Sequence, residues 1–325
     1  MNKEFLAALE EEISRLDIGQ NPSELYDPIH YLLSLGGKRI RPVLCLLTYS
    51  LFKSDWEKQV PAALSVEIFH NFTLMHDDIM DKAPLRRGKQ TVHEKWNDNI
   101  AILSGDVMLV NAYQYLNKVK GLSLEAFQHV LGRLSRIAAE VCEGQQFDMN
   151  FESRGDVTVE EYIEMIRLKT SVLIGFSMEM GGLLASAPAE VSDSLYRIGE
   201  TIGLGFQLKD DLLDVYGDPE KFGKQPGGDI LANKKTYLLI KAFEKATGST
   251  LASLESWVAA TDYVAAEKVQ AVTAIYDSLN LKAETEAVIA SYFDSAFEEI
   301  QTLAISDEQK SALVKFMSGL VDREV

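Results

Sequence analysis

The sequence is organised around Val66-Glu67-Ile68-Phe69-His70-Asn71-Phe72-Thr73-Leu74-Met75-His76-Asp77-Asp78-Ile79-Met80-Asp81. An apolar run with helical spacing leads directly into three aspartates. On a helix Asp77 and Asp81 share a face, so the three carboxylates crowd into little more than one turn and repel one another. A solvated acidic helix end is one interpretation. A hard divalent cation is the other, because Mg²⁺ takes oxygen ligands.

A second copy of the pattern favours the metal. Asp210-Asp211-Leu212-Leu213-Asp214 repeats the Asp-Asp-x-x-Asp spacing at the end of another apolar run. Mg²⁺ usually takes only one or two carboxylates from a protein and completes its shell with phosphate oxygens. The two motifs therefore predict two walls of one metal-filled site.

The composition is that of an ordinary globular protein, with 325 residues of which 46% are hydrophobic and 25% charged. The formal net charge of −17 argues against a nucleic-acid partner, because phosphate backbones need a basic face. It also disfavours an anionic membrane surface. A small anionic substrate remains compatible where metals and local cations receive it.

Several features predict a cytoplasmic protein without membrane insertion. The N-terminus runs at once into an acidic amphipathic helix, so no signal peptide is visible. The best apolar stretch, Val172 to Ala187, carries Glu179 and does not reach membrane-spanning length. Cys45 and Cys142 lie in helical stretches typical of buried, reduced thiols.

Helical periodicity dominates, and no strong alternating strand pattern appears. With proline and glycine as breaks, we predict helices over 2–17, 22–35, 41–52, 61–81, 98–118, 123–152, 158–186, 190–216, 231–246, 262–279, 281–303 and 307–321. The segments 82–96 and 217–229 are predicted loops. No linker interrupts the pattern, so residues 1–325 are interpreted as a single all-α domain.

Two basic motifs are candidate anion sites. Gly36-Gly37-Lys38-Arg39-Ile40-Arg41-Pro42 places three cations after a glycine pair, where backbone N–H groups and a helix N-terminus also favour an anion. Arg86-Arg87-Gly88-Lys89 follows the first aspartates closely, and guanidinium forks suit a diphosphate. A solvated basic loop is the alternative for both. His70 lies two turns before Asp77 on the same face of the predicted helix. It is a ligand candidate only because the aspartate and basic motifs accompany it.

Other candidates are weak when each is considered alone. Lys169-Thr170 lies within a predicted helix and would be an ordinary helix surface. Phe206-Gln207 precedes the second aspartate motif, and Lys224 and Lys234 flank the glycine-rich loop after it.

Taken together, the motifs resemble those of the trans-isoprenyl diphosphate synthases, the polyprenyl synthetase family. The resemblance covers residues 36 to 234 in order and spacing, and the helical remainder is compatible. It comprises Gly-Gly-Lys-Arg-x-Arg-Pro at 36–42, His70, both aspartate motifs, Arg86-Arg87-Gly88, Lys169-Thr170, Phe206-Gln207, Gly-Lys at 223–224, Gly-Gly-Asp at 227–229 and Lys234.

The resemblance implies a large all-α bundle of the isoprenoid synthase type around a central cavity, assembled as a homodimer. It implies that Mg²⁺, as three ions when diphosphate is bound, is held by Asp77, Asp78, Asp81, Asp210, Asp211 and Asp214. Among these, Asp77, Asp81 and Asp210 would be direct ligands, and the others would ligate or support. The allylic diphosphate would be held by Arg86, Lys169, Lys224 and Lys234. Isopentenyl diphosphate would be held by Lys38, Arg41, His70 and Arg87.

The reaction implied by the resemblance is a Mg²⁺-dependent prenyl transfer. The allylic C–O bond breaks, and Mg²⁺ with nearby cations stabilises the charge that develops on the diphosphate. The double bond of isopentenyl diphosphate attacks the carbocation, and a proton is lost to the departed diphosphate. Lys169, Thr170 and Gln207 would line the reacting centre, with Thr170 and Gln207 orienting groups near the cation.

Bulk just before the first aspartate motif sets product length in this family. Phe72 and Thr73 stand at that place, and Phe-Thr most resembles the geranylgeranyl (C20) synthases. Farnesyl (C15) and C25 synthases are alternatives, and the allylic primer stays open among dimethylallyl, geranyl and farnesyl diphosphate.

Three other kinds of protein share some of these features. A class I terpene cyclase shares metal-dependent ionisation, but it would not need the basic motif at 36–42 for a second diphosphate. A non-catalytic modulating subunit typically lacks one aspartate motif, whereas both are intact here. An acidic Ca²⁺-binding helical protein would not carry these basic motifs, and no EF-hand loop is present.

Overall fold

The structure is a computed structural model that describes residues 2–218 and 227–321. Within these residues the chain is helical almost throughout, which confirms the predicted all-α fold class. Its described strands are the two-residue pair β1 (Leu85–Arg86) and β2 (Lys89–Gln90), which form an antiparallel hairpin inside the predicted loop 82–96. The chain packs as two compact units, and its assignment to one domain stays a prediction.

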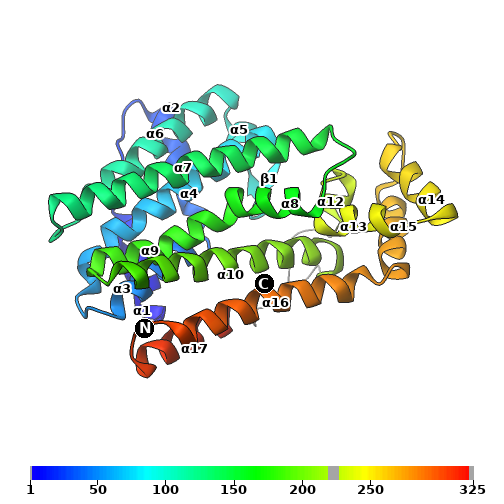
Figure 1. Ribbon diagram of the computed structural model, residues 1–325. Coiled ribbons are helices and arrows are strands. Elements are labelled where there is room, and N and C mark those ends of the chain that lie inside the picture. Colours follow the sequence, from blue (N-terminus) through cyan, green and yellow to red (C-terminus); the bar gives the residue numbers. More distant parts are fainter. Residues whose placement is uncertain (1, 219–226, 322–325) are drawn as a thin grey trace. The chain divides into compact units, whose positions relative to one another are not determined.

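Unit 1 comprises residues 1–137 and 173–197. Its centre is the pair α4 and α6, which make the most extensive helix–helix contact among the described elements (Figure 1). The elements of this unit, besides the hairpin, are α1 (Asn2–Ser14), α2 (Ser23–Ser34), α3 (Ile40–Ser50), the 3₁₀ turn η1 (Trp56–Gln59), α4 (Val60–Met80), α5 (Val92–Lys95), α6 (Asp98–Leu116) and α9 (Val172–Ala185).

Helix α4 carries the first aspartate motif on its last turn. Pro61 stands in its first turn, where the missing N–H costs no hydrogen bond, and apolar side chains from Val60 to Met75 are mostly buried. Asp81 caps the C-terminal end, and Lys82 follows with a left-handed φ of 50°. A helix C-terminus carries partial negative charge, so carboxylates there are disfavoured until a cation neutralises them. The location itself therefore favours a cation.

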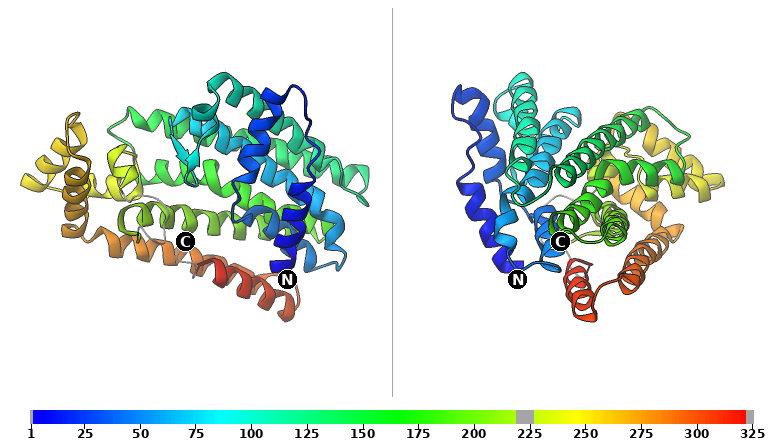
Figure 2. Two further views of the ribbon diagram at one scale, coloured as in Figure 1. Left: turned by 180° about the vertical axis from the view of Figure 1, so that it is seen from behind. Right: turned by 60° about the vertical axis from the view of Figure 1, so that its left-hand side comes forward.

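Unit 2 comprises residues 138–172 and 198–325. Helix α7 (Leu124–Glu152) begins in the residues of unit 1 and ends in those of unit 2, and so does helix α10 (Ala189–Tyr216). The second aspartate motif lies near the end of α10. Consecutive helices α16 and α17 pack against each other (Figure 2). The remaining elements are α8 (Val159–Ile166), the π-helical turn η2 (Arg167–Ser171), α12 (Gly228–Leu231), α13 (Tyr237–Lys245), α14 (Gly248–Ala259), α15 (Ala265–Ser278), α16 (Leu281–Thr302) and α17 (Asp307–Val321).

The structure differs from the predicted elements mainly after the second motif. The predicted helix 231–246 begins only at Tyr237, because Asn233 adopts a left-handed φ of 51° and Thr236 caps α13 by accepting the Leu239 N–H. The short helix α12 begins within the predicted loop 217–229. Helix α14 was not predicted, since its opening Gly-Ser-Thr is typical of a loop. Within the predicted helix 158–186, the segment Arg167–Ser171 widens to a π-helical turn.

Candidate active site

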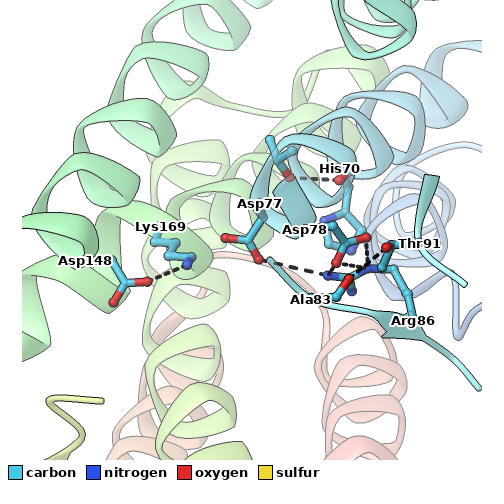
Figure 3. A network of polar contacts seen from close by, with 9 residues as sticks. His70, Asp77, Asp78, Ala83, Arg86, Thr91, Asp148 and Lys169 are labelled. Atoms are coloured by element: carbon cyan, nitrogen blue, oxygen red, sulfur yellow. Dashed lines mark hydrogen bonds and ion pairs between the residues drawn. The ribbon is translucent and has the colours of Figure 1, made fainter. Parts of the chain in front are cut away.

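Arg86 of the β1–β2 hairpin binds the first aspartate motif. The Asp78 side chain is buried, and Arg86 of β1 donates two charge-assisted hydrogen bonds to it, Nε to Oδ2 at 2.8 Å and Nη2 to Oδ1 at 2.7 Å (Figure 3). The Arg86 Nη2 atom also lies 4.0 Å from Asp77 Oδ2. Burial raises the pKa of Asp78, and the Arg86 charge opposes that rise. Arg86, predicted to bind the allylic diphosphate, here orients the middle aspartate.

The hairpin turn presents Arg87 beside the glycine pair. Arg87 and Gly88 both have left-handed φ values, of 53° and 73°, as a two-residue hairpin turn requires. The Arg87 Nη1 atom donates to the Gly36 carbonyl. A Cβ atom on Gly37 would lie 2.9 Å from Arg87 Nη2, so a larger residue would collide with the guanidinium. Two motifs that are far apart in the sequence therefore meet in unit 1.

Arg39 has a different role from the two cations that flank it. Its side chain is fully buried and donates to Glu67 Oε1 of α4 at 2.7 Å, to Glu10 Oε1 of α1 at 2.9 Å and to the Leu33 carbonyl at 2.9 Å. Lys38 is exposed and Arg41 is half-buried. Arg39 thus anchors the basic motif to the helices, a role that no sequence pattern revealed.

His70 lies among the cations of unit 1. Burial lowers the pKa of His70 well below its usual range, and the charges of Arg41, Arg86 and Arg87 lower it further. The imidazole is therefore neutral and can donate one hydrogen bond. The structure gathers these predicted basic residues closely enough for their charges to act on one another.

Phe72, the predicted chain-length residue, is buried on α4. Its ring lies 5.5 Å from that of Phe69 and 4.8 Å from that of His76, measured between centroids, the latter edge-to-face. Thr73 donates its hydroxyl to the His70 carbonyl at 2.8 Å. The Thr73 side chain is thus bound to its own helix.

Unit 2 contains a cavity of about 210 Å³. Its lining includes the second aspartate motif and other predicted site residues of this unit: Lys169, Thr170, Gln207, Asp210, Asp211, Asp214 and Lys234. Asp229 of the Gly-Gly-Asp motif also lines it, as do Asp148 and Tyr162, which belong to no motif in the sequence. Lys224, the other predicted diphosphate ligand, lies outside the described residues.

The aspartates of the second motif are held in different ways. Asp210 is exposed, whereas Asp211 is buried and accepts hydrogen bonds from Tyr162 Oη at 2.6 Å and Gln207 Nε2 at 2.9 Å. Burial and the nearby Asp229 charge raise the pKa of Asp211 to about 8. Asp214 Oδ2 accepts the Asp229 N–H at 2.9 Å, so it fixes the turn that follows Gly227.

The π-helical turn η2 presents Lys169 and Thr170. The Val172 N–H donates to the Arg167 carbonyl, the i to i+5 bond of a π-helix, and such turns are frequent at functional sites. A Cβ atom on Gly144 of α7 would lie 2.3 Å from the Lys169 backbone nitrogen, so only glycine accommodates the wide turn here. Lys169 Nζ pairs with Asp148 Oδ2 at 2.7 Å (Figure 3).

The donors available fit Mg²⁺ in combination with a phosphorylated ligand. Among the described residues no group of three or more His, Cys, Asp or Glu side chains is arranged to hold a metal alone. In each motif the middle aspartate is bound by side chains of its own unit, whereas Asp77 and Asp214 are half-buried and Asp81 and Asp210 are exposed. Mg²⁺ commonly takes one or two carboxylates and completes its shell with substrate phosphates.

Comparison with known proteins gives concordant matches. The model of the polyprenyl synthetase family matches residues 22–277. The geranylgeranyl diphosphate synthase of Methanosarcina mazei is 44% identical over 224 residues, 69% of each chain. The geranylfarnesyl diphosphate synthase of Natronomonas pharaonis is 38% identical over 239 residues, 69% of this chain and 70% of that protein. A crystal structure of geranylgeranyl pyrophosphate synthase matches with a TM-score of 0.93 at 42% identity, covering 100% of this chain and 99% of that one.

Proposed function

The chain belongs to the polyprenyl synthetase family and is a trans-prenyltransferase, and we propose that it condenses isopentenyl diphosphate with an allylic diphosphate to give geranylgeranyl diphosphate. The observation that carries this proposal is the pairing of each aspartate motif with cations of its own unit. Arg86 donates to Asp78 of the first motif and Arg87 follows it in the hairpin turn, whereas Lys169 and Lys234 line the cavity of the second motif. Two sets of cations suit two diphosphates.

The allylic diphosphate is assigned to the two aspartate motifs acting together. Asp77, Asp81 and Asp210 would hold Mg²⁺, proposed as three ions, and Asp78, Asp211 and Asp214 would support them. When bound, Mg²⁺ supplies positive charge that stabilises the departing diphosphate. Arg86, Lys169 and Lys234, with Lys224, would contact the same diphosphate, which adds charge-assisted hydrogen bonds as the negative charge grows.

Isopentenyl diphosphate is assigned to the basic residues of unit 1. Lys38 and Arg41 flank the buried Arg39, and Arg87 lies against the Gly36 carbonyl. The neutral His70 donates a hydrogen bond rather than a charge. Because Arg39 is fixed to α1 and α4, the two flanking cations are pre-organised for an anion.

The reaction then requires little acid–base chemistry from the chain. The allylic C–O bond breaks and its electron pair leaves with the diphosphate, which creates an allylic carbocation. The isopentenyl double bond supplies the electrons of the new C–C bond, and loss of a proton to the released diphosphate regenerates an alkene. Thr170 and Gln207, joined by a 3.1 Å hydrogen bond at the cavity wall, would contribute oxygen dipoles near the developing positive charge.

The C20 product is the finer part of the proposal. It rests on the buried Phe72 and on the named activities of the relatives, one of which makes a geranylfarnesyl product. Replacing Phe72 by Ala should lengthen the product, because it removes the largest side chain at the proposed floor. Unchanged length in the Phe72→Ala enzyme would remove Phe72 from that role and leave C15 and C25 as alternatives.

We further propose a cytoplasmic homodimer. Ile102, Leu103 and Val110 on α6 expose 42%, 58% and 55% of their surface, and a second copy of this chain would cover them. Sedimentation equilibrium of the full chain tests the dimer, with Leu103→Lys as the variant expected to dissociate it. No described helix is both long and apolar enough to cross a lipid bilayer.

A product assay tests the activity itself. The purified enzyme would receive isopentenyl diphosphate with dimethylallyl, geranyl or farnesyl diphosphate, with and without Mg²⁺, and product length would be determined by mass spectrometry. A Mg²⁺-dependent C20 product supports the proposal. A product beyond C25 refutes the short-chain assignment, and no product with any primer refutes independent catalysis and favours a modulating subunit.

A further inference from the structure

We propose that Tyr162 is a positioning residue for the ionisation step, because its buried hydroxyl fixes the amide of Gln207 through Asp211. The inference rests on the proposed prenyl transfer and extends it to a residue that no motif includes. Tyr162 lies on α8, where apolar periodicity makes it an ordinary core side chain by sequence.

Four side chains of unit 2 form one continuous chain of hydrogen bonds. Tyr162 Oη donates to Asp211 Oδ2 at 2.6 Å, and Gln207 Nε2 donates to Asp211 Oδ1 at 2.9 Å. Thr170 Oγ1 donates to Gln207 Oε1 at 3.1 Å. Tyr162 is 1% exposed and Asp211 is 8% exposed, so water does not compete for these bonds. All four residues line the same cavity.

The polarity of this chain determines which way the Gln207 amide points. The NH₂ group of Gln207 can only donate hydrogen bonds and its carbonyl oxygen can only accept them, so the partner on each side determines the orientation of the amide. The tyrosine hydroxyl binds one oxygen of Asp211, and the amide NH₂ of Gln207 donates to the other. The carbonyl oxygen of Gln207 is therefore directed towards Thr170. An oxygen dipole held in this orientation can stabilise a carbocation, whereas the NH₂ group would oppose it.

Removing only the tyrosine hydroxyl should release this orientation. In a Tyr162→Phe enzyme, the Asp211 Oδ2 atom loses its hydrogen-bond partner in a buried place, where an unsatisfied polar atom is costly. The carboxylate can then turn towards other donors, and the Gln207 amide no longer has a fixed partner. The aromatic ring and its packing remain, so the change is confined to the hydrogen-bond chain.

The first experiment compares Tyr162→Phe with Tyr276→Phe in the full-length enzyme. Tyr276 of α15 is a second buried tyrosine of unit 2, 2% exposed, and it does not line the cavity. Single-turnover condensation of farnesyl and isopentenyl diphosphates isolates chemistry from product release. We expect Tyr162→Phe to lower the rate about tenfold, with the KM for isopentenyl diphosphate and the product length unchanged, and Tyr276→Phe to stay near wild type. A Tyr162→Phe rate within twofold of Tyr276→Phe overturns the proposal.

A double-mutant cycle separates positioning from general stability. If Tyr162 acts through the chain, Tyr162→Phe should cost less than twofold in an enzyme that already carries Thr170→Val, because the end of the chain has been removed. Fully additive losses would show that Tyr162 acts elsewhere. A Tyr162→Phe enzyme that loses Mg²⁺-dependent binding of inorganic diphosphate in calorimetry would also refute the proposal, because the hydroxyl would then serve the metal site.

A third measurement does not depend on turnover, so it distinguishes failure of this inference from failure of the proposed function. Exchange of the Gln207 side-chain amide protons can be followed by NMR in protein labelled with ¹⁵N-glutamine. We expect slow exchange in wild type and in Tyr276→Phe, and at least tenfold faster exchange in Tyr162→Phe. Equal exchange in all three proteins overturns the inference even if the wild type is an active prenyltransferase. A wild type without condensation product, but with this exchange pattern, would refute the function alone.

Discussion

Replacing the buried Arg39 by Met should destabilise unit 1 severely. The Arg39 side chain is 0% exposed, and its partner Glu67 is only 3% exposed. Met keeps much of the side-chain volume and removes the charge with all three hydrogen bonds. What remains is a buried carboxylate to which the Asn71 side-chain amide donates at 3.1 Å.

The expected size follows from what each partner loses. Breaking a buried ion pair by removing one member costs about 3–5 kcal/mol, mainly because the remaining charge is uncompensated. The contact to Glu10 adds little, because that carboxylate is 46% exposed. For a unit of this size, 1 kcal/mol corresponds to about 2–4 °C in the unfolding midpoint. A loss of about 4 kcal/mol would therefore lower the midpoint by about 8–16 °C.

Differential scanning calorimetry and urea unfolding measure this loss, with Arg15→Met as the matched control. Arg15 pairs with Glu11 on the surface, where both side chains are more than half exposed, so its replacement should change the midpoint very little. Adding Glu67→Gln to Arg39→Met removes the orphaned charge and keeps an acceptor for Asn71, so stability should largely return. The KM for isopentenyl diphosphate should rise in Arg39→Met, because the flanking Lys38 and Arg41 lose their anchor.

Two results would refute this reasoning. An Arg39→Met protein that loses less than about 1 kcal/mol would show that the Arg39–Glu67 pair contributes little to stability. A double variant no more stable than Arg39→Met would show that the buried Glu67 charge is not the source of the loss.

Two further predictions concern α4 and its neighbours. Gly105→Ala should lower the free energy of unfolding in urea by about 1–3 kcal/mol, because its Cβ would lie 2.2 Å from His76 Nε2 and displace that ring. The control Gly132→Ala, at an exposed position of α7 with nothing within 4 Å, should instead raise it by about 0.5–1 kcal/mol. Equal effects of the two substitutions would refute the steric argument. The pKa of His70 is lowered in the folded chain, so His70 binds a proton more readily when the chain is unfolded. The free energy of unfolding of the wild type should therefore fall by up to about 1.4 kcal/mol per pH unit, relative to His70→Asn, as the pH falls below about 6.5. Parallel stability–pH curves for the two proteins would contradict that assignment.

The fold class and most helix boundaries could be predicted from the sequence because helical periodicity and glycine or proline breaks are local signals. The helix ending at Asp81 and the helix ending at Tyr216 follow directly from that pattern. Helix α14 could not be predicted, because Gly248-Ser249-Thr250 favours a loop and only packing against α15 compensates for it. The hairpin at Arg86 was not predicted, because two-residue strands are too short to show an alternating pattern.

The candidate site was predictable in its charged motifs and not in its supports. Aspartates and arginines at fixed spacing can be recognised in the sequence alone, so most of the charged residues that line the cavity of unit 2 were predicted. Arg39 and Tyr162 were not, because their partners are distant in sequence and each resembles its neighbours. Asp78 and Asp211 were predicted among the metal ligands, and the structure shows each engaged by side chains of its own unit. Their ligand role stays a prediction.

The π-helical turn at 167–171 makes the chemistry of this cavity depend on a residue count. A π-helical turn contains one residue more than the α-helical turn that it replaces, so everything within it is out of phase with α8 before it. Deleting Arg167 or Leu168 would permit a regular α-helix and rotate Lys169 and Thr170 by about 100° relative to α8. Lys169 and Thr170 would then still be present in the sequence, but their side chains would point in another direction. A family member with both residues intact but one residue fewer in this turn would therefore carry the motif without the site.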